Sequence, residues 1–234
     1  MWKQKTKLMS RFASNRKICT YEDFTVFEED FRSIYAGWLT DTAVNFGATY
    51  LKDEILGPKK EEVCLVYAFL CELIKHAGRR NSETQKLLES VEADKNKWTA
   101  FILNDNIDPT VVSGGCHWTL LVHDPIQNVL WQLDPMSDTR PPHCWQFYQK
   151  IKGFFGNEYR VLDCPKMTVN GSCGIYILEY LHIIFQCLKE GLTDVKQMDF
   201  SRINDKFAAE RRVYYCKVLN SLAEEQQRPQ ISFV

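Results

Sequence analysis

The sequence lacks any apolar run long enough to cross a bilayer, and it lacks an excess of charge of either sign. A transmembrane helix needs about 20 consecutive apolar residues, so we expect no membrane partner. The 29 basic residues almost balance the 30 acidic ones, and the net charge is −1. Proteins that bind nucleic acid use clustered basic charge, so we also expect no nucleic-acid partner.

The nine cysteines lack the paired spacing of a zinc site, and no two are separated by only two residues. Residues 1–17 are basic but lack the apolar core of a secretory signal. Disulfide frameworks belong to oxidising compartments. We therefore expect a cytoplasmic or nuclear protein, or both, with mostly buried free thiols and neither metal nor other cofactor.

No internal repeat and no linker divides the chain, which predicts a single α+β domain over 18–224, acting as a monomer. Residues 1–17 are expected to form a basic flexible arm and residues 225–234 a flexible tail. Apolar periodicity predicts helices at 37–56, 57–76, 143–155, 175–190 and 201–224. Apolar runs predict strands at 98–105, 117–123, 128–134 and 159–164.

Several local features follow from this assignment. Thr40 or Asp41 is suited to cap the helix at 37–56. Cys64 and Cys71 lie seven residues apart and would share one buried face of the next helix. We expect irregular structure at 21–34 and a polar, charge-rich connection at 77–97.

The two strands at 117–123 and 128–134 form a predicted hairpin around the turn residues 124–127. This register makes one face wholly apolar, as a core-facing sheet surface requires. The opposed apolar pairs are Trp118 with Leu133, Leu120 with Trp131, and Val122 with Val129. His117 then stands directly opposite Asp134, with their Cβ atoms roughly 4.5–5.5 Å apart.

The predicted contact between His117 and Asp134 has two interpretations. It is either a structural contact or a general base whose tautomer and charge the carboxylate fixes. A nucleophile within reach would favour the second. The other histidines lack such a partner in the pattern: His76, His123, His143 and His182.

Cys173 is the candidate nucleophile. It follows the turn-forming residues 170–172 and begins a long apolar helix. The free amides and the positive end of a helix dipole favour a thiolate there, and the same amides can bind an oxyanion. Gly174 would let a substrate backbone approach closely. An isolated cysteine at a helix start is often only a core residue, but the His117–Asp134 pair favours catalysis.

At these residues the sequence resembles the cysteine proteases specific for ubiquitin-like modifiers, the sentrin-specific or Ulp-type family. The resemblance rests on "HW" at 117–118, "LD" at 133–134, "SCG" at 172–174 and "WLTD" at 38–41. The segments "FILNDN" (101–106) and "GGCHWTLLV" (114–122) are most similar to the deneddylating type. The resemblance implies a papain-like fold, with a mixed or antiparallel central sheet flanked by helices.

The resemblance also implies roles for individual residues. Cys173 would attack the carbonyl after a C-terminal Gly-Gly, while His117 acts as base and Asp134 orients it. Trp38 and Trp118 would enclose the diglycine tail, with Gly174 beside it. Asp41 would contact a basic residue of the modifier. Structural alternatives remain open, because Trp38 can be a core anchor and Asp41 a helix cap.

One position departs from the family pattern. A glutamine that completes the oxyanion hole usually stands about six residues before the cysteine, but here that residue is Met167, whose side chain has no donor. Lys166 or Thr168 aligns instead if the loop is shortened. Ser172 replaces the usual aspartate before the cysteine. Asn170 is therefore the alternative oxyanion donor.

These observations leave several functions open. The favoured one is a thiol protease or isopeptidase that deneddylates conjugates, processes a precursor, or does both, with a ubiquitin-like modifier as its partner. The alternatives are a ubiquitin- or SUMO-directed protease, a low-activity family member that binds a modifier, and a Cys–His–Asp acyltransferase. Paired tryptophans argue against the acyltransferase, which needs no diglycine clamp.

Overall fold

A computed structural model describes residues 16–78, 81–108, 110–111, 114–156 and 158–227. The strands are β1 (Lys17–Tyr21), β2 (Phe24–Phe27), β3 (Val63–Val66), β4 (Trp98–Asn104), β5 (Trp118–Asp124), β6 (Val129–Leu133) and β7 (Glu158–Val161). The helices are α2 (Glu28–Ala36), α3 (Asp41–Leu56), α4 (Ala68–His76), α5 (Asn81–Glu89), α6 (Pro142–Ile151), α7 (Cys173–Glu190) and α8 (Asp205–Gln227). Two short 3₁₀ helices are η1 (Gly57–Glu62) and η2 (Val195–Gln197).

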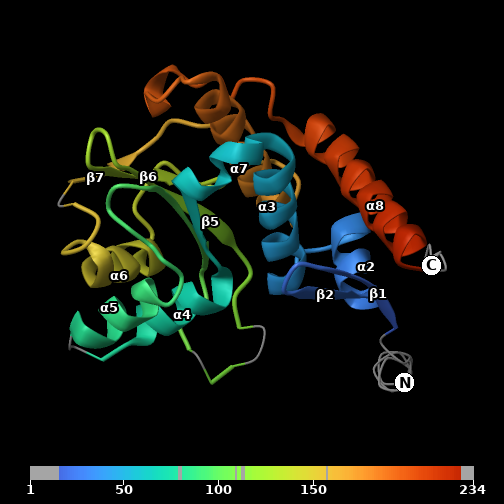
Figure 1. The fold of residues 1–234 in the computed structure, drawn as a ribbon, viewed down its shortest axis with the longest axis horizontal. Helices are drawn as coiled ribbons and strands as arrows, with labels where there is room; N and C mark the ends of the chain where they lie inside the picture. Colours follow the sequence, from blue (N-terminus) through green and yellow to red (C-terminus); the bar gives the residue numbers. More distant parts are fainter. Residues whose placement is uncertain (1–15, 79–80, 109, 112–113, 157, 228–234) are drawn as a thin grey trace, which may run out of the picture.

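The main sheet has five strands in the order β3-β4-β5-β6-β7 (Figure 1). Its three central strands pair antiparallel, and the outer strands β3 and β7 each pair parallel with a neighbour. The sheet is therefore mixed, and the α+β class expected from the sequence is confirmed.

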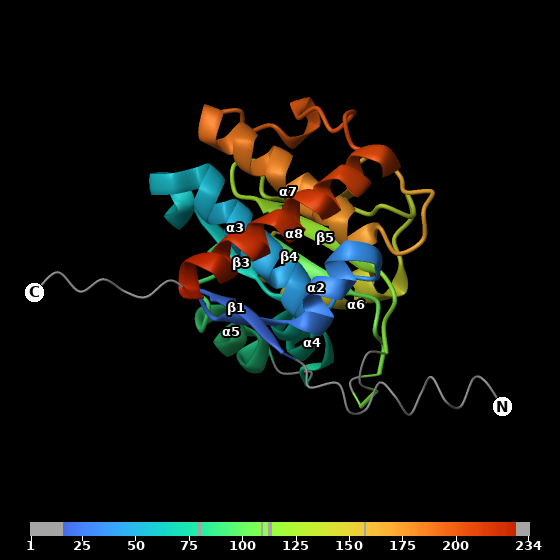
Figure 2. The same cartoon turned by 90° about the vertical axis from the view of Figure 1, so that its right-hand side faces the viewer.

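Helices cover both faces of this sheet, and the alternation of side chains along β5 explains why. Trp118, Leu120 and Val122 point into the core shared with α3 and α7. Leu121 points the opposite way, into the core shared with α4 and α6. Figure 2 shows α7 above the sheet and α4 and α5 below it. A strand buried on both faces needs apolar residues at successive positions, as this segment has.

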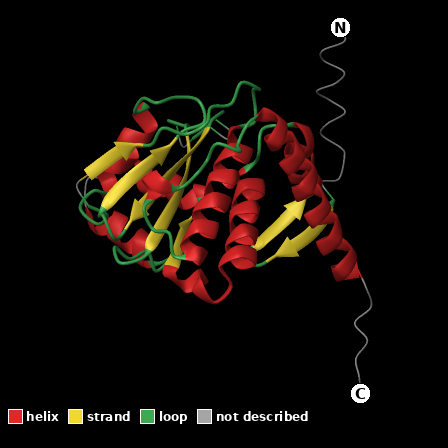
Figure 3. Cartoon of the chain, turned by 90° about the horizontal axis from the view of Figure 1, so that it is seen from above, coloured by secondary structure: helices red, strands yellow, loops and turns green. Residues whose placement is uncertain are grey.

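A smaller unit of structure stands beside the main sheet. The hairpin of β1 and β2 leads into α2, and the C-terminal helix α8 packs across β1 and α2 (Figure 3). Strand β1 begins at Lys17 and α8 continues to Gln227. The remainder of the predicted arm, 1–15, and of the predicted tail, 228–234, lies outside the described residues. Among the described helices, none is both long enough and apolar enough to cross a bilayer.

The register of the central hairpin differs from the prediction by two residues. Leu120 pairs with Leu133, and Asp124 pairs with Val129. The Asp124 carboxylate accepts hydrogen bonds from the backbone N–H groups of Ile126 and Gln127, at 2.8 and 3.0 Å, and so holds a turn over residues 125–128. Because side chains alternate with a period of two, the shift leaves every residue on its predicted face.

The predicted helix at 57–76 is wrong over its first half. Residues 57–62 form η1, and Val63–Val66 form the buried strand β3, before α4 begins. A short apolar run is compatible with either a buried strand or a buried helix, and the parallel pairing with β4 decides for the strand. Cys64 and Cys71 therefore share no helix face, although both are buried in one core.

Two further segments have more regular structure than predicted. Residues 21–34 contain β2 and most of α2, and the polar connection at 77–97 contains α5. Helix α5 is short, buries Thr84 and Leu88, and contacts α4 and α6. Packing on these helices rather than helix propensity explains such a short helix.

The cysteines behave largely as predicted. All nine are free; seven are buried, Cys187 is half-buried and Cys116 is exposed.

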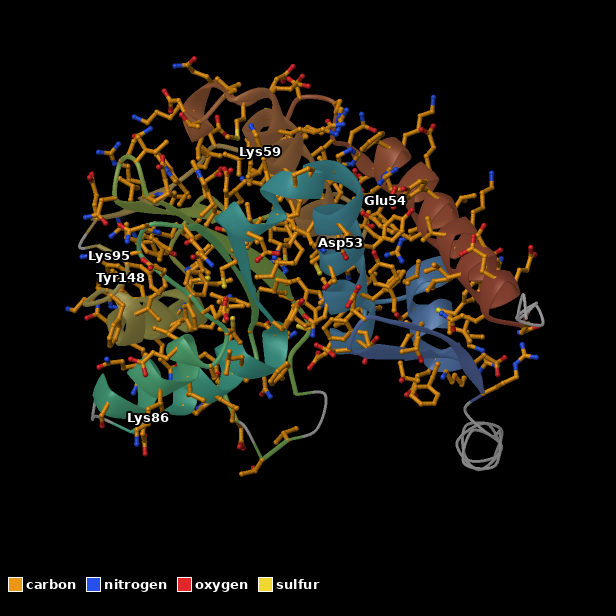
Figure 4. All side chains as sticks on the ribbon, in the orientation of Figure 1. Asp53, Glu54, Lys59, Lys86, Lys95 and Tyr148 are labelled. Atoms are coloured by element: carbon orange, nitrogen blue, oxygen red, sulfur yellow. The ribbon has the colours of Figure 1, made fainter. Side chains whose placement is uncertain are left out.

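Helix α7 is held firmly at its centre and at its C-terminal end. The Lys59 ammonium donates to the carbonyl oxygens of Leu188 and Lys189, at 3.4 and 3.0 Å (Figure 4). At mid-helix the buried Glu179 carboxylate accepts from Arg211 Nε at 2.7 Å and from the Tyr215 hydroxyl at 3.0 Å, both on α8. A buried charge persists only when it is paired in this way.

We expect Glu179→Ala to lower the free energy of unfolding by about 3–5 kcal/mol, because it leaves the half-buried Arg211 guanidinium unpaired. Urea unfolding at neutral pH measures the loss. Glu190→Ala is the matched control on the same helix, since Glu190 is exposed, and should stay within about 0.5 kcal/mol of the parent. Equal effects of the two substitutions would contradict the role of the buried pair.

Candidate active site

Cys173 is the first residue of α7 and is only 1% exposed. The preceding turn is closed by a hydrogen bond from the Ser172 N–H to the Val169 carbonyl at 3.4 Å, and Gly171 has a left-handed φ of 85°. Ser172 makes no side-chain capping bond. The first-turn amides of a helix have no intrahelical acceptor, so they are directed at the space beside the Cys173 thiol.

The imidazole of His117 meets Asp134 as predicted, but along a diagonal of the hairpin. His117 precedes β5, Asp134 follows β6, and Nε2 of the ring lies 2.8 Å from Oδ1 of the carboxylate. In the observed register the two residues are not directly opposed. A diagonal pair has Cβ atoms about 7–8 Å apart, which a histidine side chain spans.

Asp105 holds the backbone of His117 in place, and the sequence analysis assigned it no role. Its Oδ1 accepts the N–H groups of Cys116 and His117, at 2.6 and 2.9 Å, and its own N–H donates to the His117 carbonyl at 3.1 Å. A Cβ at Gly115 would lie 1.6 Å from Asn104 Oδ1. Position 115 therefore has no room for a side chain, because the segment 104–106, which contains Asp105, passes close to it.

The His117 ring is set up to remain protonated. Burial alone would lower its pKa, but the hydrogen bond to Asp134 and the interaction with Cys173 outweigh burial and raise the pKa to about 9. The other ring nitrogen, Nδ1, is buried and has no hydrogen-bond partner among the described residues. Since Asp134 occupies Nε2, Nδ1 is the nitrogen left to exchange a proton with the thiol.

A second histidine lies next to His117 and stays neutral. The ring centroids of His143 and His117 are 6.5 Å apart, and His143 Nε2 lies 3.3 Å from the Thr119 hydroxyl. Burial, together with the positive charges of Lys75 and His117, lowers the pKa of His143 to about 4. His143 therefore adds no charge beside the His117–Asp134 pair at neutral pH.

Two tryptophans flank the segment that carries Cys173. A Cβ at Gly171 would lie 2.3 Å from the Trp38 ring, and a Cβ at Gly174 would meet Leu39 at 2.9 Å and the Trp118 ring at 3.2 Å. Trp38 is 48% exposed, whereas Trp118 is 3% exposed and its indole N–H donates to the Leu39 carbonyl at 2.9 Å. The interpretation of Trp38 as a core anchor is wrong.

The same contacts explain Gly174. The protein's own Leu39 and Trp118 occupy the space beside this residue, so internal packing accounts for the glycine. A role in admitting a substrate backbone stays a prediction.

Asp41 is not the cap of α3. The Thr40 hydroxyl accepts the N–H of Ala43 at 3.1 Å and is the N-cap, which leaves Asp41 exposed in the first turn. Burial raises the pKa of Glu72, Lys75 lowers it, and the Asp41 carboxylate raises it further. Because the Glu72 carboxylate on α4 is already paired with Lys75, the exposed Asp41 carboxylate at the start of α3 is the one that favours a further cationic partner.

The oxyanion-hole positions are occupied differently from the family pattern. Met167 is partly buried against the core, and its backbone N–H donates to the Pro135 carbonyl at 2.8 Å. Lys166 is bonded to Asp138 at 2.6 Å, and the Thr168 hydroxyl is bonded to Asp205. Asn170 is exposed, with no side-chain hydrogen bond to any described residue. Of the aligned candidates, only Asn170 has a free amide.

No group of three or more His, Cys, Asp or Glu side chains suited to a metal ion occurs in the described part of the chain.

Comparison with known proteins places this arrangement in a family. The Ulp1 protease family, C-terminal catalytic domain, matches residues 37–218, which include every element that carries the candidate triad. The chain belongs to the Ulp1 protease family. The predicted papain-like, Ulp-type fold is thereby confirmed.

Individual relatives are more distant. Sentrin-specific protease 8 of Mus musculus is 25% identical over 146 residues, covering 60% of this chain and 65% of that protein. A probable sentrin-specific protease 8 of Dictyostelium discoideum is 23% identical over 192 residues, covering 75% and 77%. The structure of the yeast Ulp1 protease domain in complex with Smt3 is similar in fold, with a TM-score of 0.68, 14% identity and 94% of each chain covered.

We expect the His117 imidazole to titrate with a midpoint of about 9, and Asp134→Asn to lower that midpoint because burial remains while the carboxylate is lost. The histidine ring resonances in a proton NMR titration measure this, and His143, with a pKa of about 4, serves as the internal control.

The same shift has a consequence for stability. The folded-state pKa of His117 lies above the unfolded value of about 6.5, so its charge stabilises the fold fully below that pH. This contribution is lost as the pH rises through about 9. The free energy of unfolding of the parent, relative to Asp134→Asn, should fall over that interval; a constant difference would contradict the assignment.

Proposed function

We propose that this protein is a thiol peptidase that cleaves after the C-terminal Gly-Gly of a ubiquitin-like modifier. The observation that supports the proposal is the combination of Cys173 at the start of α7, its interaction with the His117 imidazole, and the Asp134 carboxylate that holds this imidazole through Nε2. Nucleophile, base and orienting acid in this order are the requirements of acyl transfer through a cysteine.

The chemistry follows from the positions of these groups. With the pKa of His117 raised to about 9, the proton of the Cys173 thiol rests on His117 Nδ1, and the Cys173 thiolate attacks the carbonyl carbon of the last glycine. The tetrahedral oxyanion collapses, and the His117 imidazolium donates its proton to the leaving amine. The neutral His117 then takes a proton from a water molecule, whose hydroxyl adds to the thioester carbonyl; the C–S bond breaks, which releases the modifier's carboxyl group and restores the thiolate–imidazolium pair. Throughout, Asp134 stabilises the imidazolium without taking its proton.

The residues around Cys173 are suited to a thin, side-chain-free tail. Trp38 lies over Gly171 and Trp118 lies against Gly174, so two flat rings flank the nucleophile. A diglycine segment has no side chains, so it would approach the exposed Trp38 ring and the Cys173 segment more closely than a bulkier tail. The exposed carboxylate of Asp41 would attract a basic residue of the same tail.

The neddylation modifier is the favoured substrate, either in conjugates or in its precursor. The similarity to sentrin-specific protease 8 sequences supports this choice. The yeast relative of known structure instead binds Smt3, an orthologue of SUMO. A SUMO- or ubiquitin-directed activity is therefore the alternative within the same chemistry. We further propose that the enzyme acts as a monomer. We also propose a reducing compartment, the cytoplasm or nucleus, which suits an exposed free thiol such as Cys116.

A second candidate function is binding of a modifier with little hydrolysis. Met167 favours it, because a thioether supplies no hydrogen bond to the oxyanion. Loss of a single oxyanion donor costs roughly 10²–10³ in turnover. A peptidase of this kind would be slow unless another group replaces the missing amide.

We expect the neddylation modifier fused to aminomethylcoumarin to be cleaved with at least tenfold higher kcat/KM than the corresponding ubiquitin and SUMO substrates. We also expect Cys173→Ala to abolish all cleavage, since it removes the nucleophile of the proposed triad. Fluorescence release measures both. Equal cleavage of the three substrates would overturn the modifier assignment.

A modifier carrying a C-terminal propargyl group then separates peptidase from binding module. Labelling of Cys173 supports the peptidase, and tight binding without labelling supports the module.

We expect Asn170→Ala to lower the single-turnover rate by about 10²-fold, because it removes the exposed side-chain amide that we propose as an oxyanion donor. Substrate affinity should change little. Val169→Ala is the matched control, since Val169 is an exposed neighbour without a donor. An unchanged rate in Asn170→Ala would exclude Asn170 from the oxyanion hole and leave the Cys173 backbone amide as the donor.

A further inference from the structure

Arg212 on α8 uses all of its terminal guanidinium N–H groups on backbone carbonyls. Nη1 donates to the carbonyls of Ser33 and Ile34, at 3.0 and 2.7 Å. Nη2 donates to those of Gly37 and Gly171, at 2.8 and 2.7 Å. A planar guanidinium has the fixed fork geometry that such a fourfold contact requires.

The two carbonyls bonded to Nη2 belong to the two segments that carry Trp38 and Cys173. Gly37 directly precedes Trp38, and Gly171 lies two residues before Cys173. The Trp38 ring in turn lies over Gly171, where a Cβ would approach it to 2.3 Å. One nitrogen atom of Arg212 therefore connects the segment carrying the tail-binding tryptophan with the segment carrying the nucleophile.

The carbonyls on Nη1 explain where α2 ends. The last carbonyls of a helix have no intrahelical donor, and α2 has no basic residue of its own in its last turn. The Ser33 carbonyl already accepts the Gly37 N–H at 3.0 Å, so Arg212 adds a second bond to Ser33, bonds the Ile34 carbonyl, and supplies a favourable positive charge from another helix. The C-terminal end of α2, and with it the start of the Trp38 segment, is thus fixed by α8.

Arg212 is half-buried and forms no ion pair with any described carboxylate, in contrast to its neighbour Arg211, which pairs with Glu179. Burial lowers the pKa of Arg212, and the nearby Cys173 raises it. A partly desolvated cation without an acidic partner leaves its positive charge to act on the nucleophile.

We propose that Arg212 is a positioning residue of the active site, which sets the Cys173 thiol and the Trp38 wall in their working positions through the Gly37 and Gly171 carbonyls. This role rests on the proposed function for its catalytic consequence. It does not require Arg212 to touch the substrate.

The test compares Arg212→Gln and Arg212→Lys in the full chain. Because a displacement of about 1 Å at the reacting groups costs roughly 10²-fold, we expect Arg212→Gln to lose about 10² in kcat on the modifier–coumarin substrate. Lysine keeps the charge but cannot make four directed bonds. Arg212→Lys should therefore recover part of the loss.

A second readout needs no modifier. The rate of Cys173 alkylation by iodoacetamide, followed by mass spectrometry from pH 5 to 10, reports on the thiol directly. We expect Arg212→Gln to move the acidic limb of this profile to higher pH and to lower the rate at neutral pH roughly tenfold. Arg212→Lys should return the acidic limb of the alkylation profile toward its position in the parent protein. If no modifier is cleaved by the parent protein, the proposed function fails, yet this profile still decides the role of Arg212.

Leu219→Ala provides the control for general damage to α8. Leu219 is fully buried on the same helix, so its truncation destabilises the packing of α8, and no hydrogen bond links it to the Cys173 segment. At a temperature where circular dichroism shows both variants folded, Leu219→Ala should keep kcat within about threefold and leave the alkylation profile unmoved. Unchanged kcat and profile in Arg212→Gln, or equal losses in Leu219→Ala, would overturn the proposal.

Discussion

The hydrogen bond between His117 Nε2 and Asp134 Oδ1, at 2.8 Å, determines how the rest of the site is oriented. The carboxylate occupies Nε2 and leaves Nδ1 unpaired among the described residues, and the ring interacts with Cys173 at the start of α7. The bond exists only because β5 and β6 pair and because Asp105 fixes the backbone of His117. A buried imidazole without Asp134 would lose its proton, since burial alone lowers the pKa of a histidine.

Helix α7 brings the nucleophile to this pair as part of a rigid body. Its centre is tied to α8 by Glu179 and its C-terminal end is capped by Lys59, while α8 reaches the Cys173 segment again through Arg212. The C-terminal helix therefore contacts both the middle of the nucleophile helix and the turn before it. Such repeated anchoring keeps a catalytic group close to its productive position. It also links the Trp38 segment to the same framework.

The site differs from its family where the oxyanion would form. Met167 lies at the usual place of a donor, and the hydroxyl of Thr168 and the ammonium of Lys166 are bonded elsewhere. Among the described residues, we propose the first-turn amides of α7 and the side chain of Asn170 as the donors. Electrostatic stabilisation of the oxyanion is usually the largest single contribution to acyl transfer, so this position governs how fast the enzyme works rather than which reaction it performs.

The amino-acid pattern alone determined the class of the fold and the faces of the central hairpin, and it selected His117, Asp134 and Cys173 as candidates, because alternation and helix starts are local properties that a sequence carries directly. The predicted hairpin register differs from the observed one by two residues. The register is set by hydrogen bonds from backbone N–H groups to the Asp124 carboxylate, which the apolar pattern does not reveal. The amino-acid pattern also took β3 for part of a helix, because a four-residue apolar run has no period of its own. The amino-acid pattern could not predict the roles of Asp105 and Arg212. Each residue binds backbone groups of a distant segment, and only the folded chain decides which carbonyls and amides lie close to their side chains.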